Sequence, residues 1–175
     1  MKIAYFGTHW FAIKPLSGIK DYNLLVITSK TSPIENFCKE NNINYVTPVS
    51  PNDSMCINTL KKFQPDLAIV CAYGHILKKE VLSIPKRAIG VHPSLLPRLR
   101  GAAPIQRALL QGERYTGVTI YNLTLKIDSG NILVQKAIKI DPEDNYEILG
   151  NKLGELAKKL LIYAIKNIEK LENGI

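Results

Sequence analysis

Short, almost uninterrupted apolar runs alternate along the chain with stretches of helical pattern. The clearest runs are residues 2–6 (KIAYF), 23–28 (NLLVIT) and 66–72 (DLAIVCA). Such runs are typical of parallel strands that are buried on both faces, and their alternation with helices indicates an α/β fold. We therefore predict a doubly wound, mostly parallel sheet with helices on both faces.

The remaining elements follow from the same patterns. Further strands are expected at residues 43–46, 88–91, 117–122 and 132–140, the last two antiparallel to each other. Helices are expected at residues 10–19, 33–41, 53–63 and 104–111, and residues 141–144 (DPED) carry a signal for the start of a long last helix. That helix carries an apolar stripe at spacings of three or four, which predicts core packing: Leu149, Leu153, Leu156, Leu160, Ala164, Ile168 and Leu171.

Composition narrows the class of protein. The 175 residues correspond to one ordinary domain, so we predict a single domain over residues 1–175. No stretch approaches the ~18–20 apolar residues of a membrane span, and the N-terminus shows no signal-peptide pattern, so we expect a cytoplasmic protein. The three cysteines form no CxxC pair, and we expect Cys71 to be a buried small hydrophobe. No metal-ligand cluster or phosphate-binding glycine loop is recognisable.

Basic charge is concentrated in one part of the chain. The net charge is +8, and all five arginines fall within residues 87–114. Between Lys86 and Arg114 there are six basic residues and one acidic residue, Glu113. Arginine pairs bidentately with phosphate and carboxylate groups, whereas lysine does not. Charge alone fits a solvated basic surface as well as a site for an anionic partner.

Two polar residues are expected at strand ends, where open parallel sheets bind ligands. His92 follows the predicted strand 88–91 and is held by Pro93, while Asp128 lies in the loop after residue 122. Such a pair can act as an acid or stabilise charge, because a carboxylate favours the protonated imidazole. The residues alone fit a capping histidine and a turn aspartate better. His9 either lines the same crevice or starts a helix, and His75 fits an exposed loop.

Three motifs in order add a family resemblance. HPSLLPRLRGAAPIQ (92–106), TGVTI (116–120) and IDSGNIL (127–133) resemble the formyltransferases that use 10-formyltetrahydrofolate. GAAPIQRALLQG (101–112) is similar to the members that act on methionyl-tRNA. FGTHWFA (6–12) and PDLAIVCAYGHIL (65–77) extend the resemblance to the whole chain, which corresponds to the family's N-terminal catalytic domain.

The resemblance implies a reaction and a set of site residues. An amine attacks the formyl carbon of 10-formyltetrahydrofolate, and hydrogen-bond donors stabilise the resulting oxyanion. No metal and no membrane are implied. The catalytic residues fall on His92 and Asp128, and the family's catalytic Asn falls on Gly90. Residues expected at the folate are Ser94, Leu95, Leu96, Pro97, Tyr73, Gly74, Ile76, Leu77 and Leu125. Arg98, Arg100 and His9 are candidates for an anionic acceptor such as tRNA.

Three departures from the family pattern keep other functions open. Gly90 lacks a side-chain donor, a loss that commonly costs ~10²–10³ in rate, so we expect Gly90→Asn to raise the rate roughly tenfold or more. Residues 28–33 (TSKTSP) are short where tRNA-specific members carry a basic insertion, and the family's C-terminal β-barrel domain is expected to be absent. The alternatives are a small amine acceptor (an amino-sugar nucleotide or glycinamide ribonucleotide) or a catalytically impaired folate- or RNA-binding domain.

Overall fold

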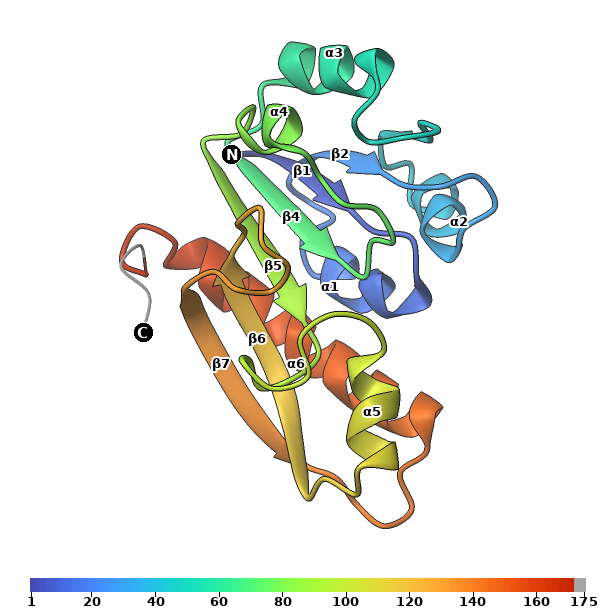
Figure 1. Cartoon of the computed structure of the whole chain (residues 1–175). Coiled ribbons are helices and arrows are strands. Elements are labelled where there is room, and N and C mark those ends of the chain that lie inside the picture. Colours follow the sequence, from blue (N-terminus) through green and yellow to red (C-terminus); the bar gives the residue numbers. More distant parts are fainter. Residues whose placement is uncertain (172–175) are drawn as a thin grey trace. The chain divides into compact units, whose positions relative to one another are not determined.

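The computed structural model describes residues 1–171 and contains the predicted strands and helices (Figure 1). Its contacts divide the chain into two compact units, the first from Met1 to Ile89 and the second from Gly90 onward. Within residues 1–171, no helix is long and apolar enough to cross a membrane.

The first unit is built on parallel strands, as predicted. Its strands are β1 (Lys2–Phe6), β2 (Asn23–Ile27), β3 (Tyr45–Val46) and β4 (Leu67–Cys71). They pair in parallel in the order β3-β2-β1-β4. Apolar side chains of β1 and β4 such as Ile3, Tyr5 and Ile69 have no exposed surface. The near-continuous apolar runs therefore do mark strands covered on both faces.

Polar side chains cap some of the helices of the first unit. They are η1 (Trp10–Ala12, a 3₁₀ turn), α1 (Ile13–Ser17), α2 (Pro33–Glu40), α3 (Ser54–Phe63) and α4 (Lys79–Leu82). Ser32 caps α2 by accepting from the Glu35 amide, and Asp53 caps α3 by accepting from the Cys56 amide. The single helix expected over residues 10–19 is instead a 3₁₀ turn followed by a short α-helix, because His9 caps the turn and Gly18 ends the helix.

The second unit contains an antiparallel pair of strands. Strand β5 (Arg87–His92) runs across the boundary between the units, and β5, β6 (Tyr115–Asn122) and β7 (Ile132–Lys139) follow in this order in the sheet. β6 and β7 are antiparallel, as predicted, and their register shifts between Ile120 and Tyr121. Such an irregularity bends a strand locally and changes the direction of nearby side chains.

Two helices complete the second unit, α5 (Pro104–Leu110) and α6 (Tyr146–Lys166). α6 packs on β6 and β7 through its buried leucines, which confirms the predicted core stripe as far as Ala164. Ile168 is also buried, but it and Leu171 lie beyond the end of the helix.

The helix-start signal at residues 141–144 lies directly before the last helix, which begins at Tyr146. The Asp144 carboxylate accepts a hydrogen bond from the Asp141 amide, which closes a turn, and Asn145 is the residue that caps α6. Short polar side chains compete for backbone amides in this way, so the signal residues form a turn and the next residue caps the helix.

Candidate active site

His92 ends β5 and is 7% exposed. Its Nε2 lies 3.0 Å from the carbonyl oxygen of Leu99, and its Nδ1 lies 3.4 Å from Oδ2 of Asp128. A carbonyl oxygen can only accept, so Nε2 carries the hydrogen in that contact. Both ring nitrogens therefore face acceptor oxygens.

Asp128 lies in the loop between β6 and β7, and its carboxylate contacts two further groups besides His92. Its Oδ2 accepts from the Gly101 amide at 2.7 Å, and its Oδ1 accepts from the Tyr121 hydroxyl at 2.5 Å. Its backbone is left-handed, with φ of 47°, a conformation that is uncommon outside glycine and is often found at functional sites. The structure thus brings together His92 and Asp128, the two residues expected to carry the chemistry.

Gly130 explains the spacing of the Asp-Ser-Gly motif. A Cβ atom at this position would lie 1.6 Å from the carbonyl oxygen of Asn122, so only glycine allows the chain to pass so close to the end of β6. The motif therefore positions Asp128 by sterics as well as by hydrogen bonds.

The loop after His92 is tied to the sheet through two residues that the sequence did not identify. The Thr119 hydroxyl donates to the Ser94 carbonyl at 2.7 Å and accepts from the Leu96 amide at 3.2 Å. The Gln135 amide donates to the Leu96 carbonyl at 3.0 Å and to the Thr119 hydroxyl at 2.7 Å. A polar residue in a predicted strand was the available signal, but its partners lie more than twenty residues away in the chain.

Of the folate residues expected in the second unit, Ser94 and Leu96 are buried, and the Ser94 hydroxyl donates to the Arg98 carbonyl. The Leu95 side chain packs against Gly117 of β6. Pro97 and Leu125 are exposed, Leu125 to 62%. The loop after His92 is thus held at Ser94 and Leu96 and exposed at Pro97.

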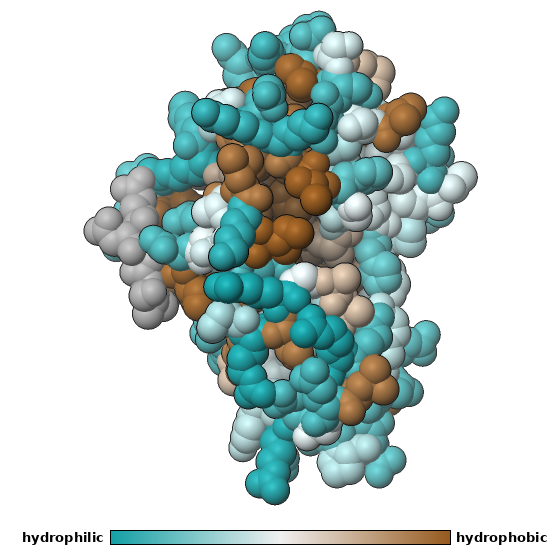
Figure 2. All heavy atoms as spheres, in the orientation of Figure 1, coloured by the Kyte–Doolittle hydropathy of each residue, from teal (hydrophilic) through white to brown (hydrophobic). Residues whose placement is uncertain are grey.

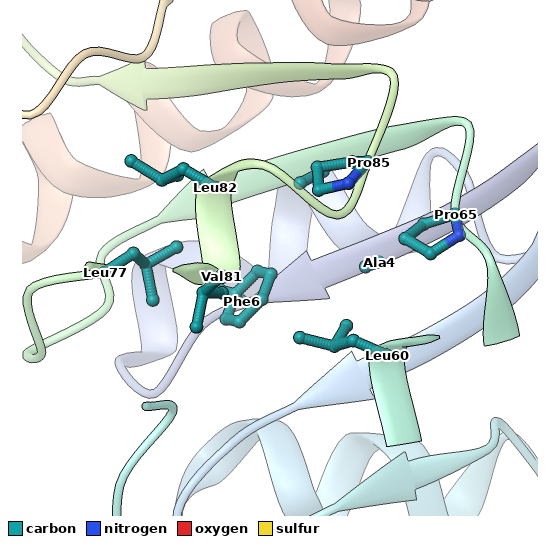
Figure 3. A pocket seen from close by; sticks show the side chains of 9 residues that line it. Ala4, Phe6, Leu60, Pro65, Leu77, Val81, Leu82 and Pro85 are labelled. Atoms are coloured by element: carbon teal, nitrogen blue, oxygen red, sulfur yellow. The ribbon is translucent and has the colours of Figure 1, made fainter. Parts of the chain in front are cut away.

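The expected folate residues of the first unit follow β4. The Tyr73 ring packs edge-on against Phe6 at 5.5 Å, and burial raises its pKa. Gly74 and Ile76 are exposed, whereas Leu77 is buried. Apolar side chains gather around α4 and β4 (Figure 2). Leu77 lines an apolar pocket there with residues of β1, α3 and α4 (Figure 3).

The candidate anion-binding residues differ in what already holds them. Arg98 forms an ion pair with Glu113, the one acidic residue of the basic stretch, although the arginine remains largely exposed. Arg100 is exposed, and its carbonyl accepts from Arg107. His9 is exposed and accepts from the Phe11 amide through Nδ1, and partial burial lowers its pKa.

Gly90 does not leave an empty space. A Cβ atom there would lie 2.4–2.5 Å from the ring and hydroxyl atoms of Tyr121. The expectation that an asparagine could simply be added at this position therefore needs correction, because the Tyr121 ring occupies the room. Within residues 1–171, no group of three or more His, Cys, Asp or Glu side chains is arranged to hold a metal ion.

Comparison with known proteins places these observations in a family. The profile of the family described as formyl transferase matches residues 20–165. Methionyl-tRNA formyltransferase from Wolbachia sp. subsp. Drosophila simulans is 40% identical over 97% of this chain and 62% of its own length. The protein of the same name from Caldicellulosiruptor saccharolyticus is 40% identical over 98% of this chain and 60% of its own. The chain thus spans about 60% of the length of these relatives.

Solved structures share the fold. Phosphoribosylglycinamide formyltransferase from Streptococcus pneumoniae TIGR4 superposes with a TM-score of 0.83 at 20% identity, covering 95% of this chain and 98% of that one. WlaRD, a sugar 3N-formyl transferase, superposes with a TM-score of 0.72 at 23% identity over 99% of this chain and 64% of its own. The predicted α/β formyltransferase fold is confirmed.

Proposed function

Because the chain belongs to the formyl transferase family, we propose that it transfers the formyl group of 10-formyltetrahydrofolate to an amine, with methionyl-tRNA as the acceptor. The observation that carries the proposal is the His92–Asp128 pair, held at 3.4 Å at the end of β5. The acceptor is proposed from the names of the two relatives described above, each called methionyl-tRNA formyltransferase. A cytoplasmic location, where charged tRNA is used, belongs to the same proposal.

The proposed reaction needs no covalent bond to the protein. The amine nitrogen bonds to the formyl carbon, the bond from that carbon to N10 of the folate breaks, the amine loses a proton and N10 gains one. His92 donates a hydrogen bond to the oxyanion that forms between these events. Since Nδ1 faces Asp128, the contact that His92 must exchange for the oxyanion is the one from Nε2 to Leu99. Asp128 holds the ring and takes up the amine proton through water.

Apolar surface beside the pair supports a folate site. Leu125 and Ile127 are 62% and 57% exposed on the loop that carries Asp128. Ligand sites typically combine apolar walls with a few well-placed polar groups, and a pterin ring is flat and largely apolar on its faces. Ser94 to Pro97 supply a loop already tied to the sheet by Thr119 and Gln135.

A small amine is the second candidate acceptor. The observation in its favour is the connection between β2 and α2, which is only residues 28–32 long and is closed by the hydrogen bond between Thr28 and Ser32. The basic insertion of tRNA-specific members, expected at this place from the family resemblance, is not present in that connection.

The experiment offers purified protein 10-formyltetrahydrofolate together with methionyl-tRNA, glycinamide ribonucleotide or an amino-sugar nucleotide. We expect formylation of methionyl-tRNA, detected as N-formylmethionine after hydrolysis, and none with an Asp128→Asn variant. Transfer to a small amine and never to tRNA would overturn the proposed acceptor. Folate binding without transfer to any of the three would overturn the proposed activity and indicate a binding domain.

Binding of tRNA is further expected to weaken steeply with salt, because contacts to phosphates release counterions. Arg100→Ala is expected to lower the slope of log K against log salt by about 1 if its side chain contacts one phosphate. Lys61→Ala on the exposed face of α3 is the matched control and should leave the slope unchanged. Equal slopes for the wild-type and Arg100→Ala proteins would contradict a phosphate contact at Arg100.

A further inference from the structure

We propose that Tyr121 is a positioning residue of this site, whose hydroxyl holds Asp128 against His92, and that Gly90 is glycine because the Tyr121 ring needs its space. The proposal depends on the proposed function only in those tests that measure enzyme activity. It deepens that function by assigning a role to Tyr121, which no motif identifies, and a steric reason to Gly90.

The fold directs the Tyr121 side chain into the unit. Tyr121 is the residue before the last of β6 and is 5% exposed. The register between β6 and β7 shifts between Ile120 and Tyr121, so that Tyr121 pairs with Ile132 while Ile120 pairs with Val134. Irregularities of this kind occur next to active sites, where they re-aim a side chain.

Gly90 is required for space and not for backbone conformation. Its backbone does not have the positive φ that favours glycine, unlike Gly101 and Gly112. A Cβ atom there would lie 2.4 Å from Cε1 and Cζ of Tyr121 and 2.5 Å from its hydroxyl oxygen. Real side chains essentially never approach this closely, so Gly90 and the Tyr121 ring are a sterically matched pair.

The Tyr121 hydroxyl completes the hydrogen bonding of Asp128. One carboxylate oxygen, Oδ2, is shared by the Gly101 amide at 2.7 Å and His92 Nδ1 at 3.4 Å. The other, Oδ1, accepts from Tyr121 at 2.5 Å. Hydrogen bonds to a carboxylate are short and strong. With both oxygens held, the carboxylate cannot turn away from His92; without the hydroxyl, rotation about its last bond becomes easier.

The first test separates the hydroxyl from the ring. Tyr121→Phe keeps the aromatic ring and removes the hydrogen bond to Asp128. We expect kcat to fall by roughly tenfold to a hundredfold, the size of effect that loss of a hydrogen bond to a charged group produces. KM for the folate and for the acceptor should stay within about twofold, because Tyr121 acts through Asp128. Tyr115→Phe, at the exposed start of the same strand, is the matched control and should keep wild-type kcat.

The second test uses the steric pair. Gly90→Ala is expected to displace the ring and lower kcat at least as much as Tyr121→Phe. In a Tyr121→Leu background the ring is gone, so Gly90→Ala should then change kcat by less than about twofold, which is strong non-additivity for residues in contact. Additive effects of the two substitutions, or wild-type kcat in Tyr121→Phe, would overturn the proposal.

A readout without turnover keeps the proposal separate from the proposed function. The chain has three histidines, so the ring nitrogen signals of His92 can be followed by NMR beside those of His9 and His75. We expect Tyr121→Phe to move the His92 signals and leave the other two in place. Unmoved His92 signals overturn the positioning role even if the enzyme is active, whereas moved signals support it even if wild-type protein transfers no formyl group.

Discussion

Buried polar side chains serve different purposes in the two units. In the first unit Thr28, Ser32 and Glu35 are buried around the start of α2, and the bond between Thr28 and Ser32 joins residues four apart in sequence. In the second unit buried Thr119 joins the loop after His92 to β6, and Gln135 reaches Leu96 from 39 residues away. The local contacts stabilise the start of a helix, whereas the long-range contacts hold the loop beside the candidate site in place.

This contrast predicts that substitutions in the two units separate stability from activity. The apolar first unit should respond mainly through folding free energy. The polar loop of the second unit should respond mainly through the rate of the reaction.

The largest effect on rate is expected at His92. His92→Ala removes the proposed donor to the oxyanion and should lower kcat by roughly 10³-fold or more, with little change in melting temperature. Single-turnover formyl transfer measures the rate, and His75→Ala, in an exposed loop, is the control. An alanine variant that keeps more than a tenth of the wild-type rate would contradict the role of His92.

The largest effect on stability is expected in the first unit. Ile69 has no exposed surface in the middle of β4, and Ile69→Ala should cost about 2–5 kcal/mol of unfolding free energy through lost packing and a cavity. Denaturant unfolding measures the cost, while kcat per folded molecule should stay at the wild-type value. Val49→Ala, at a side chain that is 94% exposed, serves as control. A large loss of kcat in folded Ile69→Ala protein would break the comparison between the units.

A matched pair of threonines on β6 gives a smaller and sharper test. Thr119→Val leaves the Ser94 carbonyl and the Leu96 amide without their partner, which costs about 1–3 kcal/mol for each buried group and should lower kcat roughly tenfold by loosening the loop. Thr116 is equally buried, but its hydroxyl has no hydrogen-bond partner among the described residues. Thr116→Val should therefore be neutral or stabilising. Equal losses in both variants would show that the loop contacts of Thr119 do not matter.

The smallest effect is expected from thiol reagents. Burial raises the pKa of Cys38 and Cys56 to about 11 and that of Cys71 to about 12. The reactive thiolate is thus scarce at pH 8, and a disulfide reagent should modify none of the three in folded protein and all three after unfolding. Unfolded thiols ionise at lower pH than the buried ones, so the thiols contribute their full stabilisation below pH ~9 and lose it toward pH ~11. The denaturant concentration at the midpoint of unfolding should therefore fall over this interval. Rapid modification of native protein at pH 8 would contradict the burial.

Much of this fold is local and could be predicted. Apolar runs and helical patterns identify β1, β2, β4, α2 and α3 because neighbouring residues supply the signal. The clearest failure, the single helix expected over residues 10–19, is local as well, since His9 caps a 3₁₀ turn and Gly18 ends a short α-helix. His92 and Asp128 could be named as candidates from the sequence, because His92 follows a predicted strand and Asp128 lies in the loop after another, and the family resemblance then implied their roles.

The sequence by itself therefore determined the α/β pattern, the basic stretch and the choice of His92 and Asp128 as the residues proposed to carry the chemistry. Only the tertiary structure decided that Glu113 already neutralises part of Arg98, that Thr119 anchors the loop, and that the space beside Gly90 is filled by Tyr121. The physical reason is range. Strand and helix signals act over a few residues, whereas hydrogen bonds and steric exclusion between Gly90, Tyr121 and Asp128 exist only once distant segments pack together.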